Sequence, residues 1–374
     1  MLITDKQELK KYGPGYRAWQ GIPGIEVTKG GRIFSCFYSG GVREQLGNFV
    51  VLLRSDDGVN FEDPVAVAYN GTESRCYDAT LWTDPLGRLW LIWSVMPNHS
   101  VYAAICDEPD AQELVWGEEF LIGHDVMMNK PTVLSTGEWL FPVSVWDQGV
   151  RVMPEEYDTK QEERGAFVYR TVDQGRTFEK LGGANMAEPS YDEHMILELQ
   201  DGRLANYVRT RYGIGVSYSE DKGLTWTAGE DSGIWGPDSR FHFRRLPSGR
   251  VLLINNLKGE EEKVRTNLSA MLSEDDGKTW KYQLLLDERL QVSYPDVALG
   301  EDGYIYVTYD RERGCFKTTL EEAYACAREV LYARITEEDI MAGRLVSHES
   351  KLKCIISRLD ELADDAENPY EGLK

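Results

Sequence analysis

Short apolar runs separated by polar turns recur along most of the chain, a pattern that predicts β-strands joined by hairpins. Six of the turns have one form, in which polar or small residues lead into a glycine and a strand rich in Leu, Ile, Val or Trp follows. Glycine supplies the positive φ that such a tight turn requires. The six glycines are Gly31, Gly87, Gly137, Gly202, Gly249 and Gly303.

The spacing of these glycines predicts the architecture. Successive glycines are 56, 50, 65, 47 and 54 residues apart, which indicates six copies of one unit. A unit of that length is large enough for a four-stranded sheet. We therefore expect an all-β fold, a six-bladed β-propeller whose blades are four-stranded antiparallel sheets.

A second repeat lies between the hairpins and has the form Ser/Thr-x-Asp-x-Gly-x-Thr-aromatic. It occupies residues 171–178, 219–226 and 273–280, and a copy one residue shorter occupies residues 55–61. The Asp side chain of such a turn can accept backbone N–H groups of its own loop, and Gly takes the left-handed position. We expect the aromatic side chain to fill the space between sheets, so that these turns build the fold and carry no chemistry.

This repeat resembles the Asp box of the sialidase superfamily, whose members are six-bladed propellers. The resemblance extends over about residues 22–343, and it implies that residues 1–374 form a single propeller domain. An acidic tail follows from about residue 364, and we expect it to be frayed.

One segment near the C-terminus interrupts the strand pattern. Residues 319–328 contain helix formers with acidic residues first, residues 329–335 read as a strand, and residues 336–343 read as a short capped helix that ends at glycine. Residues 350–356 then predict a further strand. We expect a short helical insertion in the last blade.

Composition excludes several classes of partner. The chain carries 41 Lys and Arg against 63 Asp and Glu, a net charge of −22. This charge repels phosphate backbones and anionic lipid headgroups, so we expect neither nucleic acid nor a membrane surface as a partner. A small anion is still compatible, because the local field of a pocket can oppose the net charge.

The sequence gives no signal for a metal or a cofactor. The six cysteines form no C-x-x-C pair, the five histidines have no ligand spacing, and no phosphate-binding glycine loop opens a helix. Residues 1–10 lack an apolar segment of signal-peptide length, and no run of 18 apolar residues occurs. We therefore expect free thiols and a cytoplasmic protein.

Three stretches match the positions that carry chemistry in sialidases. Glu193 opens one inner strand and Arg209 closes the next, as in the sialidase pair of a glutamate and an arginine. Arg265 precedes the Asp box at residues 273–280, which is the place of a substrate-binding arginine. Tyr294, just before the last hairpin, resembles the sialidase nucleophile.

The resemblance implies a role for each group. A neutral phenol approaches a reacting carbon that carries a carboxylate without the repulsion that Asp or Glu would experience. Since the ordinary pKa of tyrosine is near 10, Tyr294 needs a base, and Glu193 would serve. The general acid must be protonated at the working pH. Glu44 and Asp78 are both candidates, and the sequence does not rank them.

One motif departs from the family. Sialidases begin the first blade with Arg-Ile-Pro, whose arginine completes a triad on the substrate carboxylate, whereas Gly21 precedes Ile-Pro in this chain. Either another cation replaces that arginine, or the substrate is not an ordinary sialic acid. The candidate replacements are Arg17, Arg43, Arg240 and Lys130.

The sequence thus predicts an exo-glycosidase that removes a terminal acidic sugar from a glycan with retention. Two alternatives stay open. One is a related propeller glycosidase or lyase that acts on a neutral or uronic sugar, and the other is a non-catalytic propeller that binds glycans. Fold alone does not separate the three.

Overall fold

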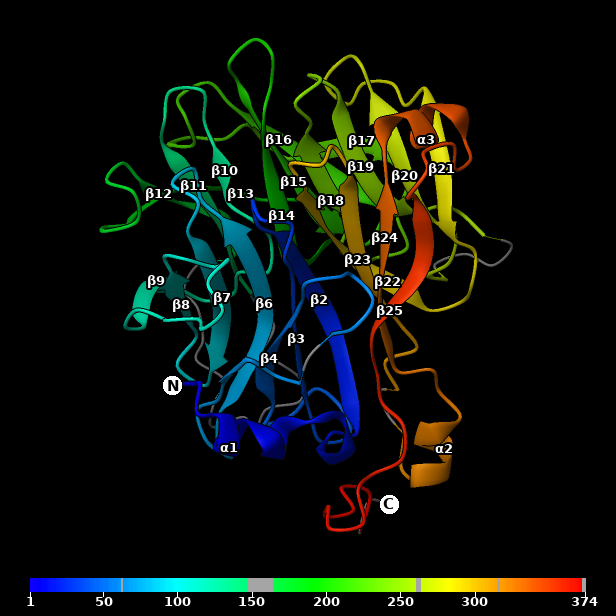
Figure 1. Ribbon diagram of the computed structural model, residues 1–374. Helices are drawn as coiled ribbons and strands as arrows, with labels where there is room; N and C mark the ends of the chain where they lie inside the picture. The colour runs from blue at the N-terminus through cyan, green and yellow to red at the C-terminus, as the bar shows by residue number, and fades with distance from the viewer. Residues whose placement is uncertain (62, 147–163, 260–263, 315–316, 372–374) are drawn as a thin grey trace.

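The computed structural model describes residues 1–374 except 62, 147–163, 260–263, 315–316 and 372–374. Six antiparallel sheets surround a common axis, and each is built from strands that are consecutive in the sequence, apart from one strand added to the first sheet (Figure 1). The predicted six-bladed propeller is therefore confirmed. Among the described residues, helices are confined to short segments before the first blade and within the last one.

Blades 1 to 3 occupy the first half of the chain. Blade 1 contains β2 (Trp19–Val27), β3 (Ile33–Gly40), β4 (Phe49–Ser55) and β5 (Ala66–Ala68), and β1 (Leu2–Ile3) pairs with β5 as a fifth strand. Blade 2 contains β6 (Arg75–Thr83), β7 (Leu89–Met96), β8 (Ser100–Cys106) and β9 (Phe120–His124). Blade 3 contains β10 (Thr132–Val133), β11 (Trp139–Val145), β12 (Gly165–Thr171) and β13 (Glu179–Ala184).

Blades 4 to 6 complete the ring. Blade 4 contains β14 (Pro189–Glu198), β15 (Leu204–Thr210), β16 (Ile214–Ser219) and β17 (Glu230–Ile234). Blade 5 contains β18 (His242–Arg245), β19 (Val251–Asn256), β20 (Leu268–Ser273) and β21 (Tyr282–Asp287). Blade 6 contains β22 (Val292–Leu299), β23 (Ile305–Arg311), β24 (Glu329–Ile335) and β25 (Lys351–Arg358). The helices are α1 (Lys6–Leu9), α2 (Leu320–Tyr324) and α3 (Glu337–Ala342).

The local rules inferred from the sequence hold. All six hairpin glycines have φ between 80° and 99°. In the Asp boxes, the carboxylate of Asp275 accepts the Thr279 N–H at 2.8 Å, and Asp221 accepts that of Thr225 at the same distance. The aromatic residue of a box packs between sheets, since the Phe178 ring of blade 3 lies 6.1 Å from the Phe120 ring of blade 2.

The helical insertion is confirmed, with α2 capped by Thr319 and α3 closed by Gly343. The acidic tail makes two contacts with the rest of the molecule. Tyr370 is only 5% exposed because it packs with Ala18, Val42 and Ala323, and the Tyr16 hydroxyl donates to Asp365. In Figure 1 this red segment runs beside α2 at the lower end of the molecule.

The first and last blades close the ring without sharing a strand. Side chains join them instead: Gln20 Nε2 donates to the Arg328 carbonyl at 2.7 Å, and the Asp310 carboxylate accepts the Ile22 N–H at 2.8 Å. Asp296 accepts the Ile25 N–H at 3.0 Å. The seam between blades 1 and 6 is thus held by buried polar groups.

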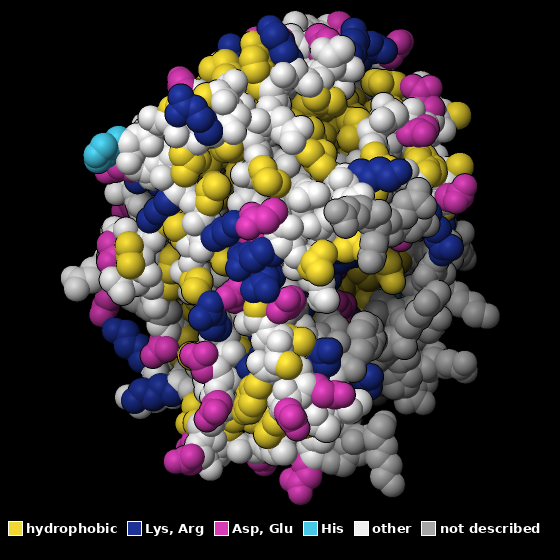
Figure 2. Space-filling model, turned by 90° about the vertical axis from the view of Figure 1, so that its right-hand side faces the viewer, with side chains coloured by type: hydrophobic (Ala, Val, Ile, Leu, Met, Phe, Trp, Pro, Cys, Tyr) yellow, Lys and Arg dark blue, Asp and Glu magenta, His cyan; other side chains and the backbone are white. Residues whose placement is uncertain are grey.

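Charged side chains of both signs lie on the surface of the molecule. On the face shown in Figure 2, basic and acidic side chains lie next to one another rather than in separate fields. Ion pairs at the surface include Arg334 with Asp302 and Lys353 with Glu288. Among the described helices, none is long and apolar enough to cross a membrane.

Candidate active site

Four of the six inner strands are interrupted by a β-bulge near the end at which they begin. Each bulge contains a residue other than glycine with positive φ. Bulges redirect side chains, and left-handed residues other than glycine gather at functional sites. These residues are Ile22 (58°), Asp78 (46°), Asp192 (47°) and Tyr294 (56°), and in the bulge of β14 Tyr191 (61°) joins Asp192.

These bulges lie at one end of the axial channel, because the inner strands all run in the same direction around the ring. It is the lower end in Figure 1, where β23 leads on toward α2. Two of the redirected residues, Asp78 and Tyr294, are candidates that the sequence singled out. Distortion of the strands therefore marks the site independently of any motif.

Tyr294, Glu193 and Arg209 form a closed triangle of hydrogen bonds at this end. The Tyr294 hydroxyl donates to Glu193 Oε1 at 3.2 Å, and Arg209 Nη1 donates to that same oxygen at 2.8 Å and to the Tyr294 hydroxyl at 2.9 Å. The three residues are at most 6% exposed. Because Tyr294 comes from blade 6 and the other two from blade 4, the contact joins blades that are not neighbours.

The electrostatics of the triangle keep the phenol neutral. Burial raises the pKa of Tyr294 to about 12, and Glu193 adds to this rise, while Arg209 and two further arginines oppose it. Tyr294 is therefore protonated at rest and carries its proton toward Glu193. Asp238 accepts from Arg209 Nε at 2.8 Å and holds the guanidinium in place.

Two more guanidiniums lie over the Tyr294 ring. That of Arg265 is 5.2 Å from the ring centroid, and its Nη2 donates to the Asp238 carbonyl at 3.0 Å. That of Arg313 is 4.7 Å from the same centroid. Arg313 was not found from the sequence, because it lies after β23, outside the repeats and outside the positions that match the family. Its only signal is its place directly after a strand of the blade that carries Tyr294.

The two candidate acids have opposite environments. Glu44 accepts from Arg75 at 3.0 Å and from Arg313 at 3.3 Å; burial works against ionisation, but these two arginines lower its pKa overall. Asp78 is 3% exposed, and burial raises its pKa to about 8, with Glu44 and Glu193 adding to the rise and Arg75 opposing it. At neutral pH, Glu44 is ionised and Asp78 holds a proton.

Aromatic rings border the cluster. Tyr191 is 38% exposed, lies under the Arg209 guanidinium at 5.1 Å and meets Trp146 edge-on at 5.1 Å. Arg75 lies over Tyr77 at 4.5 Å. Such rings offer flat apolar faces beside polar groups, which suits a sugar ring.

The four cations considered as replacements at Gly21 lie elsewhere. Lys130 and Arg240 are buried in the axis of the propeller, where the Asp296 carboxylate lies 3.1 Å from Lys130 Nζ and 3.5 Å from Arg240 Nη2. Arg17 donates to the Gly13 carbonyl at 3.3 Å, in the N-terminal segment. Arg43 is exposed in the turn before β4.

The axial network is a separate structure. Asp296 also pairs with His242 at 3.2 Å, and burial lowers the pKa of His242 to about 4, so this histidine is neutral. Lys130 Nζ further contacts Glu26 at 3.2 Å and the Ile25 carbonyl at 2.7 Å. These bonds hold inner strands together beneath the site. Within the described ranges, no three His, Cys, Asp or Glu side chains gather as metal ligands would.

Comparison with known proteins agrees with the fold. The model of the family described as BNR repeat-like domain matches residues 31–307. No curated protein matches the sequence. The Hadza microbial sialidase Hz136 superposes with a TM-score of 0.62 at 18% identity, over 79% of this chain and 65% of that one. This chain therefore spans less than two thirds of the length of that sialidase.

Two further solved structures show the same similarity. The NanB sialidase from Streptococcus pneumoniae gives a TM-score of 0.58 at 13% identity, over 80% of this chain and 66% of that one. The intramolecular trans-sialidase from Ruminococcus gnavus gives 0.62 at 12% identity, over 88% of this chain and 97% of that one. At these identities the similarity establishes a common fold.

Proposed function

This chain belongs to the family of the BNR repeat-like domain, and from that premise we propose that it is a retaining exo-glycosidase that removes a terminal acidic sugar from a glycan. The observation that carries the proposal is the hydrogen bond of 3.2 Å between the Tyr294 hydroxyl and Glu193. A tyrosine becomes a nucleophile only beside a base, and here the base is in contact.

The reaction has two steps. In the first, the Tyr294 oxygen attacks the anomeric carbon, its proton passes to Glu193 Oε1, and the bond to the leaving oxygen breaks. Asp78 protonates that oxygen as it leaves. In the second step, water attacks the anomeric carbon and the bond from that carbon to Tyr294 breaks. Asp78 takes a proton from the water, and Glu193 returns its proton to the Tyr294 oxygen.

The choice of Asp78 as acid rests on its surroundings. The residue lies in a bulge at the site, is buried, and has a pKa of about 8, so it holds the proton that the leaving group needs at neutral pH. Glu44 is held as an anion between Arg75 and Arg313 and has no proton to give. We assign Glu44 to positioning.

The preference for an acidic sugar rests on the arginines. Arg209 and Arg265 place two guanidiniums beside the nucleophile. A planar guanidinium binds a carboxylate through paired hydrogen bonds. Because the protein as a whole carries −22, this positive region sits inside a negative molecule and selects a small anion rather than a polyanion.

The test is a panel of aryl glycosides that carry sialic, uronic or neutral sugars. We expect turnover of a sialoside or a related acidic glycoside, with retention at the anomeric carbon observed by NMR. Mass spectrometry of enzyme quenched during turnover should detect the sugar on the peptide that contains Tyr294. Turnover of neutral sugars alone, inversion, or tight binding of a glycan without turnover would contradict the proposal.

A further inference from the structure

We propose that Arg313 supplies the third anion-binding guanidinium of the site, entering from blade 6 through the space that Gly21 leaves open in blade 1. This inference rests on the proposed function, since it concerns the same site. It makes Arg313 a binding residue for the carboxylate of the substrate and Glu44 its positioning residue.

Gly21 leaves space that the Arg313 side chain occupies. A Cβ built on Gly21 would lie 2.2 Å from Arg313 Cδ, 2.6 Å from Arg313 Cγ and 3.1 Å from Asp310 Oδ2. Contacts below 3.0 Å essentially never occur, so a side chain at position 21 and Arg313 in its present place exclude one another. Glycine at this position is the condition for the entry of Arg313.

The Arg313 side chain ends beside the proposed nucleophile. The Arg313 guanidinium lies 4.7 Å from the Tyr294 ring centroid, and that of Arg265 lies 5.2 Å from it. Arg209 donates to the Tyr294 hydroxyl. Three guanidiniums thus surround the Tyr294 phenol. A substrate whose reacting carbon carries a carboxylate would place that carboxylate among them.

Arg265 differs from the other two arginines in its charge partners. Arg209 is paired with Glu193 and Asp238, and Arg313 with Glu44 and Asp310. In the part of the chain that the structure describes, no carboxylate lies within ion-pair distance of Arg265. Burial lowers its pKa, and Arg209 and Arg313 lower it further. A substrate carboxylate between Arg265 and Arg313 would supply the counter-charge that Arg265 lacks.

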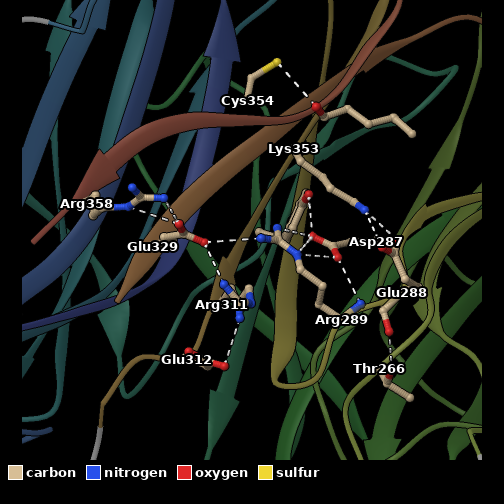
Figure 3. A network of polar contacts seen from close by, with 12 residues as sticks. Thr266, Asp287, Glu288, Arg289, Arg311, Glu312, Glu329, Lys353, Cys354 and Arg358 are labelled. Carbon is tan, nitrogen blue, oxygen red and sulfur yellow. Dashed lines mark hydrogen bonds and ion pairs between the residues drawn. The ribbon is translucent and has the colours of Figure 1, made fainter. Parts of the chain in front are cut away.

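Hydrogen bonds and ion pairs hold the chain just before Arg313 in place. Arg311 Nη1 donates to Glu329 at 3.2 Å and its Nη2 to Glu312 at 3.0 Å, and Arg358 binds Glu329 from the other side (Figure 3). Glu312 also accepts the Ala327 N–H at 2.7 Å. This network fixes the residues directly before Arg313, so that its direction is set before a ligand arrives.

Two carboxylates contact the Arg313 side chain and orient it. Asp310 Oδ2 lies 3.5 Å from Arg313 Nε and also accepts the Ile22 N–H, so it links Arg313 to the bulge of β2. Glu44 Oε1 accepts from Arg313 Nη1 at 3.3 Å, while its other oxygen is held by Arg75. Glu44 therefore orients Arg313 and does not exchange protons with the substrate.

The experiment compares four variants with the wild type: Arg313→Ala, Gly21→Ala, their combination, and Arg176→Ala. Arg176 is an exposed arginine on the Asp-box turn at residues 171–178, and it serves as the matched control. Binding of free N-acetylneuraminic acid and of its methyl ester is measured by calorimetry, and kcat and KM are measured on the best acidic aryl glycoside. Thermal melting checks that each variant is folded.

We expect Arg313→Ala to weaken binding of the free acid roughly 10- to 100-fold, the effect of one lost charge-assisted hydrogen-bonding group, and to change binding of the methyl ester much less. Gly21→Ala should weaken acid binding in the same direction by displacing Arg313, and the combined variant should be no worse than Arg313→Ala alone. Arg176→Ala should bind as the wild type does.

Equal binding of the free acid by Arg313→Ala and the wild type would overturn the inference, and so would additive losses in the combined variant. If the wild type binds the acid but turns over no glycoside, the proposed function fails and the Arg313 result still decides this inference. If the wild type binds neither the acid nor its ester, both are overturned.

Discussion

Both ends of the inner strands contain residues with positive φ, but the residue types that adopt it differ between the two ends. At one end, each hairpin turns through a glycine with positive φ, and the six turns are alike. At the other end, four strands pass through the same left-handed region with Ile22, Asp78, Asp192 and Tyr294. Glycine adopts this region without strain, whereas other residues there cost of order 1–3 kcal/mol each.

The difference separates the part of each blade that is the same in all six blades from the part that differs from blade to blade. The hairpin end is built by local rules that recur in every blade, and its purpose is the fold. The bulged end accepts strain at four places, and at two of them the strained residue is a proposed reacting group. Substitutions at the two ends should therefore separate stability from activity, and the following predictions are ordered from the largest expected effect to the smallest.

The largest effect should come from the nucleophile. Tyr294→Phe removes the attacking oxygen but keeps the ring over which Arg265 and Arg313 lie, so hydrolysis of an acidic aryl glycoside should fall to background while the melting temperature changes little. Glu193→Gln should lower kcat roughly 10²- to 10⁴-fold by removing the base. A Tyr294→Phe enzyme that retains wild-type kcat would show that the strain at this end has another purpose.

The pH dependence of kcat/KM and the effect of the leaving group on the rate should identify the proton donor. A pKa of about 8 means that Asp78 is protonated below that pH and ionised above it, so kcat/KM should fall as pH rises through about 8. Asp78→Asn should abolish this limb and slow substrates with alkyl leaving groups roughly 10²- to 10⁴-fold. A nitrophenolate needs no proton, so aryl substrates should be affected far less. Glu44→Gln should preserve the limb, and its loss in that variant would reverse the two assignments.

A third prediction concerns the hairpin end. Gly137 has φ of 99° and open space around it, so Gly137→Ala introduces backbone strain without a clash. We expect a loss of about 1–2 kcal/mol in the free energy of unfolding, measured with urea, and unchanged kcat/KM. Gly117→Ala is the matched control, because Gly117 is exposed and has no positive φ. Loss of activity in Gly137→Ala would show that the two ends are coupled.

The smallest effect should come from an Asp box. Hydrogen bonds from Thr279 and Ser273 lower the pKa of Asp275 to about 2, so its contribution to stability is present above the ordinary carboxyl pKa near 4 and is lost as pH falls toward 2. Asp275→Ala should lower the melting temperature slightly at pH 7, and the difference from the wild type should shrink as pH falls from 5 to 2. A difference that grows on acidification would contradict this reading.

Sequence reasoning succeeded where structure is set locally. The hairpin glycines, the Asp boxes and the caps of α3 follow from a few adjacent residues, and all were predicted. It also named Tyr294, Glu193, Arg209 and Arg265, which the fold brings together, although the sequence alone gave neither their distances nor their contacts.

It failed where neighbours come from distant blades. Burial raises the pKa of Asp78, whereas Arg75 of blade 2 and Arg313 of blade 6 lower that of Glu44, and neither environment can be read from adjacent residues. Lys130 and Arg240 are neutralised in the axis by Asp296, a pairing between blades. Arg313 itself follows a strand of the last blade and acts at the first, so only the closed ring reveals it.

The seam between blades 1 and 6 also has a consequence for how the protein matures. The contacts of Gly21 with Arg313 and of Ile22 with Asp310 join segments that are distant in the sequence, since Ile22 and Asp310 are 288 residues apart. The proposed site is therefore incomplete until blade 6 has closed against blade 1. The proposed glycosidase activity would then report closure of the ring, and two fragments divided between blades should regain it only when they assemble.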